Sequence, residues 1–209
     1  MISFPVISFA FMKRNKMAAF AIFYLFTYII AADMHSPSLS PHIAEKIRCE
    51  IDTISSWVTL PVIVNAVKEQ NAENLSMETL HKRDSIWIEI TESNGAPNDL
   101  MKQLQNNKTG RWLKNLRKKS IGKYRECFLC DNKGALVAVS DITSDYFQGD
   151  ESKWIDCFNN GLGKAIYALP AYDKSADAVL IQISVPVKEA GETIGVLVVG
   201  VKLSTLRYN

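Results

Sequence analysis

The sequence predicts an α+β fold: a five-stranded antiparallel, PAS-like sheet with a long helix before it. Apolar residues recur every three or four positions through much of residues 43–116, which is typical of helices. The second half instead holds short β-rich runs separated by turn residues. Helices gathered before consecutive strands indicate one α+β domain, and 209 residues provide room for it and a leader.

The first half is expected to form three helical segments. Isoleucine and valine between residues 43 and 58 recur at spacings of three and four, which predicts a long amphipathic helix. Pro61 should kink or interrupt this helix before its apolar stripe continues. Ser76 is a candidate N-cap for a helix over 77–90, and a third helix over 100–116 is interrupted between 106 and 110.

The second half is expected to build the sheet. The predicted strands are 124–130, 135–139, 164–168, 179–187 and 194–203. The turn Asp131–Gly134 makes the first two a hairpin, and the turn 190–192 joins the last two. Asp150 and Gly161 are suited to begin and end a helix over 150–160, and 170–177 is expected to be a loop.

The first 32 residues resemble a secretory leader in their layout. Lys13, Arg14 and Lys16 precede an apolar run that ends in two alanines, Ala31 and Ala32. The run is shorter than the ~20 residues of a spanning helix, so cleavage before Asp33 is favoured over a retained anchor at 17–32. We therefore expect a periplasmic or exported protein, with 1–32 as signal peptide or anchor and 33–209 as one domain; Met12 is an alternative start.

Four cysteines are Cys49, Cys127, Cys130 and Cys157. The Cys-x-x-Cys pair lies in a predicted strand, where residues three apart face opposite sides, whereas redox pairs occupy helix N-termini. Zinc would need further ligands, and all three histidines precede residue 82. We expect structural thiols or a long-range disulfide, no cofactor, no metal and no catalysis. A periplasmic thiol-redox protein using Cys127 and Cys130 stays an alternative, as does a ligand-free interaction protein.

The formal net charge is +2, which favours no particular partner. One basic run, residues 111–125, could contact nucleic acid or anionic lipid. No recognition motif accompanies it, so we interpret it as a solvated helix face and expect no nucleic-acid partner.

Three segments together resemble a known family. They are the hairpin Asp131–Ser140, the loop and helix Ser144–Trp154, and the two closing strands around Ser184–Val187 and Thr193–Gly200. This order resembles the extracytoplasmic Cache (PDC) sensor domains of bacterial histidine kinases and chemoreceptors, over residues 40 to 206. The resemblance implies a small-molecule sensor, here without an output domain, that signals through a membrane receptor or a homodimer built on the N-terminal helix.

The resemblance also implies a ligand site with two departures. In amino-acid-binding members, an arginine two residues before the helix tryptophan binds the ligand carboxylate, and an aspartate on the last strand binds its amine. Ser152 and Lys202 stand at these positions here. Both departures speak against an ordinary α-amino acid, and Lys153 with Lys202 would suit a carboxylate or another small polar metabolite.

The candidate ligand contacts each have a structural alternative. Tyr146 and Trp154 are expected as an aromatic lid, although Trp154 could instead fill the core. Gln182 interrupts an apolar strand with a donor and an acceptor, or lies on a solvated face. The full set of candidates is Tyr146, Lys153, Trp154, Tyr167, Tyr172, Asp173, Gln182 and Lys202.

Overall fold

The computed structural model describes residues 39–173 and 177–207. The predicted leader and its cleavage point before Asp33 lie outside these residues. Residues from Pro41 onward form one compact unit, which is the unit described below. In the described part of the chain no helix is both long and apolar enough to span a bilayer.

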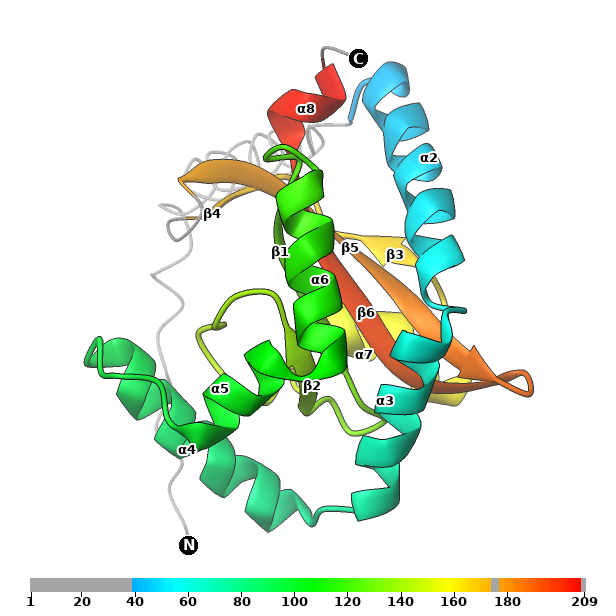
Figure 1. Ribbon diagram of the computed structural model, residues 1–209. Helices are drawn as coiled ribbons and strands as arrows, with labels where there is room; N and C mark the ends of the chain where they lie inside the picture. Colours follow the sequence, from blue (N-terminus) through cyan, green and yellow to red (C-terminus); the bar gives the residue numbers. More distant parts are fainter. Residues whose placement is uncertain (1–38, 174–176, 208–209) are drawn as a thin grey trace, which may run out of the picture. The chain divides into compact units, whose positions relative to one another are not determined.

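An antiparallel sheet forms the centre of the domain (Figure 1). Its strands are β1 (Tyr124–Cys130), β2 (Leu136–Val139), β3 (Ile166–Tyr167), β4 (Ala171–Asp173), β5 (Ala178–Glu189) and β6 (Glu192–Lys202). The order is β2-β1-β6-β5-β3, with β4 also paired to β5. The predicted α+β class is therefore confirmed. The strands number six rather than five, because 171–173, expected in a loop, pairs with residues 178–180.

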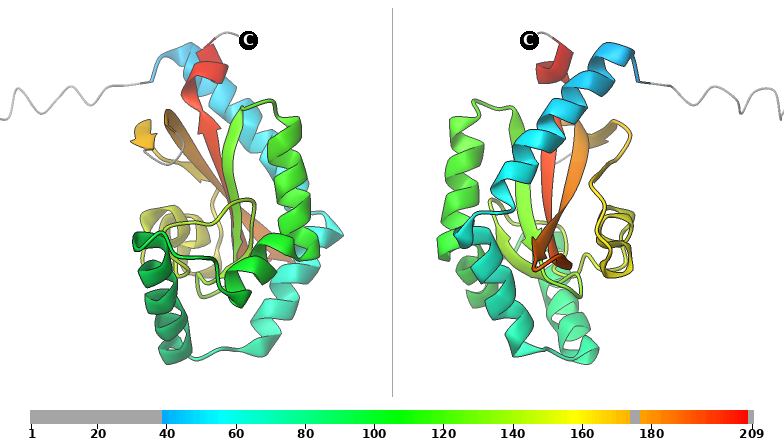
Figure 2. Two further views of the ribbon diagram at one scale, coloured as in Figure 1. Left: turned by 60° about the vertical axis from the view of Figure 1, so that its left-hand side comes forward. Right: turned by 90° about the vertical axis from the view of Figure 1, so that its right-hand side faces the viewer.

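Helices cover both faces of this sheet (Figure 2). The helices are α2 (Pro41–Trp57), α3 (Pro61–Glu73), α4 (Met77–Glu92), α5 (Asp99–Asn106), α6 (Lys108–Lys119), α7 (Ser152–Phe158) and α8 (Leu203–Arg207). Helices α2, α3 and α6 lie on one face, while α7 packs against β3, β5 and β6 on the other. The second face also holds the cleft described below.

Proline and capping residues divide the helices much as expected. Pro61 occupies the start of α3 and separates it from α2, because a proline lacks the N–H that would continue the helix. Ser76 caps α4 by accepting a hydrogen bond from the Thr79 N–H at 3.2 Å. Asn107 does the same for α6, through the Gly110 N–H at 2.7 Å, and so separates α5 from α6.

Local geometry differs from expectation at two places, α7 and α8, whereas the predicted turn 190–192 is confirmed. Helix α7 begins at Ser152 after Glu151, so Asp150 is not its cap. The turn between β5 and β6 has positive φ at both Ala190 and Gly191, the backbone of a type I′ hairpin turn. Residues 203–207, which follow β6, form the short helix α8, with Leu203 and Leu206 buried.

Strands β1, β2 and β6 and most of β5 are buried on both faces, which explains their nearly continuous apolar sequence. Towards α2 and α3 the sheet packs against Ile47, Ile54 and Ile63, all without exposed surface. Towards α4, α5 and α7 a second cluster is built around Phe128, Trp87 and other buried side chains. These two layers enclose β1, β6 and β5 between them. The site lies where the second layer leaves part of the sheet uncovered.

Candidate functional site

A cleft of about 970 Å³ opens on the α7 side of the sheet. Its floor comes from β1, β5 and the end of β4, and its walls from the C-terminal end of α4, the 141–148 loop, α6 and α7. The polar and charged side chains that line it are Thr91, Glu92, Asn94, Arg117, Arg125, Glu126, Asp141, Thr143, Ser144, Asp145, Gln148, Lys153, Asp173 and Gln182. The size lies within the range of small-molecule sites, and the lining is rich in groups that can orient a ligand.

A polar pair crosses the floor of the cleft above a glycine. Glu126 on β1 and Gln182 on β5 both pair with Gly200 of the strand between them. The Gln182 Nε2 donates to the Glu126 Oε1 at 2.7 Å. A Cβ on Gly200 would lie 2.6 Å from the Glu126 Cγ, so the absence of a side chain at 200 makes room for the pair.

The environment of Glu126 disfavours its charge. Burial raises the pKa of this carboxyl group, and the nearby carboxylates of Asp173 and Glu151 raise it further. The Gln182 hydrogen bond and the Lys153 ammonium act in the opposite direction. Lys153 itself is 15% exposed, pairs with Glu151 at 2.9 Å and lies over the Phe128 ring at 5.3 Å from its centre.

Helix α4 holds the loop that forms one wall. The Asp84 Oδ1 accepts from the backbone N–H groups of Tyr146 and Phe147, both at 2.9 Å. One turn later the Trp87 Nε1 donates to the Thr143 carbonyl at 2.9 Å, and the Thr91 hydroxyl donates to the Ser144 carbonyl at 2.8 Å. Three side chains on one helix face therefore fix the path of the 141–148 loop.

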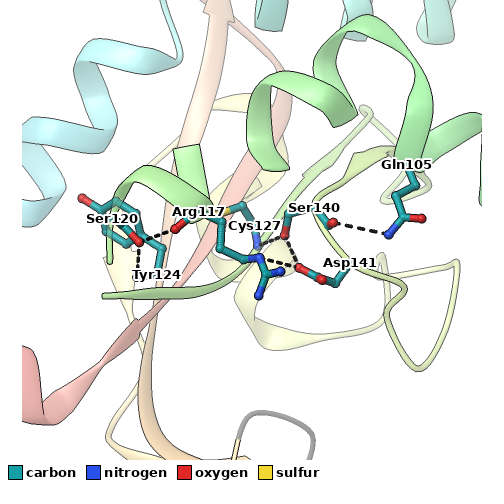
Figure 3. A network of polar contacts seen from close by, with 7 residues as sticks. All are labelled: Gln105, Arg117, Ser120, Tyr124, Cys127, Ser140 and Asp141. Carbon is teal, nitrogen blue, oxygen red and sulfur yellow. Dashed lines mark hydrogen bonds and ion pairs between the residues drawn. The ribbon is translucent and has the colours of Figure 1, made fainter. Parts of the chain in front are cut away.

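A second polar network holds the start of the same loop (Figure 3). The Arg117 Nε lies 2.8 Å from the Asp141 Oδ2, which also accepts from the Ser140 hydroxyl at 3.0 Å. That hydroxyl accepts from the Cys127 N–H, and the Ser140 carbonyl accepts from the Gln105 amide at 3.4 Å. The network joins α5 and α6 to β1, and it shows that the basic run is not a purely solvated face.

All four cysteines are free thiols, so of the two expected alternatives the structure fits structural thiols and not a long-range disulfide. Cys127, Cys130 and Cys157 are buried, and burial raises the pKa of each thiol, to about 12 for Cys157. Thiolate is the reactive form, so these surroundings oppose thiol exchange at Cys127 and Cys130. In the described residues no three histidine, cysteine or acidic side chains gather to hold a metal ion.

The structure brings three of the eight predicted contacts into the cleft: Lys153, Asp173 and Gln182. Asp173 and Gln182 also border a smaller cavity of about 340 Å³, which Tyr172 lines from β4. Tyr172 is 61% exposed, and its hydroxyl donates to the Asp177 carboxylate at 2.6 Å. Ligand contact by these residues stays a prediction.

The other four predicted contacts lie elsewhere, and the expected lid does not form. Tyr146 is fully buried, with its ring 5.8 Å from that of Trp87, because the backbone bonds to Asp84 turn this part of the loop inward. Trp154 stacks on Phe158 and donates to the Asp131 carbonyl at 3.1 Å.

The remaining two positions are set by their strands. Tyr167 on β3 is partly exposed and pairs with Ile183. Lys202 closes β6 and lines neither cavity, so it does not join Lys153 in a carboxylate site.

Several site residues were missed by the sequence reasoning, among them Glu126, Arg117, Gln148 and Gly200. Two of them carried a signal. Glu126, beside Arg125, is a charge inside a strand that continues as an apolar run, and Gly200 interrupts the run from Val196 to Val201. Their meaning depends on strand register, which places both beside Gln182, 56 residues beyond Glu126 in the chain.

Comparisons with known proteins give a fold-level likeness only. No family model matches the sequence, and no curated protein is similar to it. Solved structures with a similar backbone include ligand-binding sensor domains of chemoreceptors and histidine kinases.

Three of these structures show the extent of the likeness. The ligand-binding domain of the Campylobacter jejuni chemoreceptor Tlp3 with 4-methylisoleucine is 14% identical, with a TM-score of 0.39 over 80% of this chain and 62% of that one. The Vibrio cholerae DctB histidine kinase sensor domain is 14% identical, with a TM-score of 0.39 over 77% and 59%. The Pseudomonas aeruginosa chemoreceptor PctC ligand-binding domain with GABA is 16% identical, with a TM-score of 0.34 over 62% and 58%.

These matches span about three fifths of the sensor-domain chains. At such identities and TM-scores the likeness assigns neither a family nor a ligand to this chain. The fold and the cleft themselves define its class: an α+β domain with a polar, sheet-floored cleft of small-molecule size.

Proposed function

We propose that this chain is a ligand-binding sensory domain of the Cache/PDC type, which acts in the periplasm. It binds a small polar molecule in the cleft and passes the event to another protein. The observation that carries the proposal is the Glu126–Gln182 pair over Gly200. Half-buried polar groups on an otherwise apolar stretch of sheet cost folding free energy to desolvate, so their position under an open cleft favours a ligand.

The surrounding contacts support a site whose shape is set before the ligand arrives. The 141–148 wall is held by α4 at Ser144 and Tyr146, and by α6 through the Arg117–Asp141 pair. A ligand that bridges this wall and the floor would bind preferentially to one arrangement of them, and only such a preference can shift a conformational equilibrium.

Helix α2 offers a route from the floor to a partner. Glu50 is buried on α2, and its carboxylate pairs with the Lys123 ammonium and accepts from the Tyr124 hydroxyl at 3.0 Å. Lys123 immediately precedes β1 and Tyr124 begins it, two residues before Glu126. We infer that a shift of β1 reaches α2, whose outer face is exposed and suited to a receptor or a second copy.

A thermal-shift and calorimetry screen tests the proposal. Amines, carboxylates, amino acids and sugars are added to the wild type, and at least one class should raise the melting temperature, because a ligand that binds only the native state stabilises it. Gln182→Leu should abolish that shift, while Gln103→Leu, at an exposed position of α5 outside the cleft, should keep it. No stabilisation by any class, or an equal shift in Gln182→Leu, would refute the proposal.

A further inference from the structure

The side chains that line the cleft carry more negative than positive charges. Five carboxylates, on Glu92, Glu126, Asp141, Asp145 and Asp173, accompany three basic side chains, on Arg117, Arg125 and Lys153. Two of the basic groups already have acidic partners: Arg117 pairs with Asp141, and Lys153 pairs with Glu151, which is not part of the lining. The cleft therefore offers a ligand an excess of negative charge.

One of these negative charges, the Glu126 carboxylate, lies on the floor of the cleft. Within the described residues Glu126 forms no ion pair with lysine or arginine, and its carboxylate accepts a hydrogen bond from the neutral Gln182 amide. A partly desolvated carboxylate with only a neutral donor is stabilised strongly by a nearby cation. The open space beside Glu126 is where such a cation can enter.

Gln148 supplies an independent sign of a missing donor. Its side chain is 1% exposed and lines the same cleft. The Nε2 donates to the Asp145 carboxylate, and a carboxylate only accepts, so the amide orientation is fixed with Oε1 as its acceptor. Among the described residues this Oε1 has no hydrogen-bond partner. Buried acceptors in native proteins are almost always satisfied, so a ligand N–H fits here.

We propose that the cleft is specific for a small organic cation bearing protonated primary amines, which donate hydrogen bonds to Glu126 and Gln148. This inference rests on the proposed function and names the ligand class of the same site. An ammonium group carries three donors and no acceptor, which matches a lining that supplies a carboxylate on the floor and a fixed amide oxygen in the wall. Arg117 and Lys153, being paired already, leave little for a ligand carboxylate.

Three four-carbon ligands that differ only at their ends test the charge preference. Isothermal titration at pH 7 and constant ionic strength compares 1,4-diaminobutane, 4-aminobutanoate and succinate. The diamine should bind at least about tenfold more tightly than 4-aminobutanoate, and succinate should not bind, since like charges in a partly desolvated site repel.

Two variants and a matched control test whether Glu126 is responsible for the preference for the diamine. Glu126→Gln should weaken diamine binding by about tenfold or more, because it keeps the shape and removes the charge. Gly200→Ala should weaken it as well, since its Cβ displaces the Glu126 side chain. Glu192→Gln removes the same charge at an exposed position of the β5–β6 turn, outside the cleft, and should leave the affinity unchanged. Circular dichroism of each variant confirms that it is folded.

The outcomes separate this inference from the proposed function. Equal or tighter binding of succinate or 4-aminobutanoate, no binding of the diamine, or diamine binding unaffected by Glu126→Gln would each overturn the cation proposal. In those cases the proposed function still stands if another ligand class binds the wild type and fails to bind Gln182→Leu. It falls when no class binds at all, or when the ligands that bind the wild type bind Gln182→Leu equally well.

Discussion

The bond between α4 and the cleft wall can be broken by one substitution, Asp84→Ala. It leaves the buried N–H groups of Tyr146 and Phe147 without their acceptor. Each unsatisfied buried donor costs about 1–3 kcal/mol, so we expect a loss of about 2–6 kcal/mol in the free energy of unfolding. For a domain of this size that corresponds to a fall in melting temperature of at least about 4 °C. Asp84→Asn keeps an acceptor oxygen and loses only the charge, so it should cost roughly half as much.

Urea unfolding followed by circular dichroism measures these differences. Asp52→Ala is the control, because Asp52 is also a mid-helix aspartate, lies exposed on α2, and so shares the change in helix propensity. The prediction requires wild type, Asp84→Asn and Asp84→Ala to rank in that order of decreasing stability. If Asp84→Ala lies within about 0.5 kcal/mol of Asp52→Ala, the loop is not held by this carboxylate and the reasoning is wrong.

Three further predictions address other parts of the molecule. Glu50→Ala should destabilise the domain by about 3–5 kcal/mol, because it leaves Lys123 and the Tyr124 hydroxyl near the core without their shared carboxylate. Glu69→Ala, at an exposed position, is the control, and an equal denaturation midpoint in the two variants would contradict the prediction. In native protein at pH 8, only the exposed Cys49 should react quickly with a thiol reagent, since burial raises the pKa of the other three thiols; fast labelling of Cys127 in a Cys49→Ser variant would show that the strand is open. The pKa of Glu126 is raised in the folded state, so the native state binds the proton of this carboxyl group more tightly than the unfolded state does. The contribution of Glu126 to stability therefore falls as the pH rises from 4.5, the ordinary pKa of a glutamate, through the folded pKa. Glu126→Gln should therefore gain stability over wild type across that window and hold the gain at neutral pH, and parallel stability–pH curves would disprove it.

The secondary structure was largely accessible from the sequence because each strong signal was local. The spacing of isoleucines in α2, the proline at α3 and the serine cap of α4 act within a few residues of themselves. Strand β4 was missed because three residues are too few to show alternation, and its pairing with β5 is a tertiary contact.

The site was much harder to predict from the sequence, because its residues come together only through the pairing of the strands. Gln182 was recognised as a polar interruption, but its partner Glu126 lies on a strand that joins it only across β6. Tyr146 was expected at the ligand because aromatic residues in loops often form lids. The Asp84 carboxylate, 62 residues earlier, turns that part of the loop into the core instead. Such long-range polar contacts leave no periodic trace in a sequence.

The bare Cα of Gly200 also bears on how this domain could change in evolution. The side chain at this position takes no part in the strand hydrogen bonds, and the space above it is filled by Glu126 rather than by core residues. One codon change to alanine would raise the floor by a single methyl group and force the acidic side chain aside, with the sheet pairing left in place. Under the proposed function, ligand preference and fold are thus encoded at separable positions, and a descendant could bind a different ligand with the same fold.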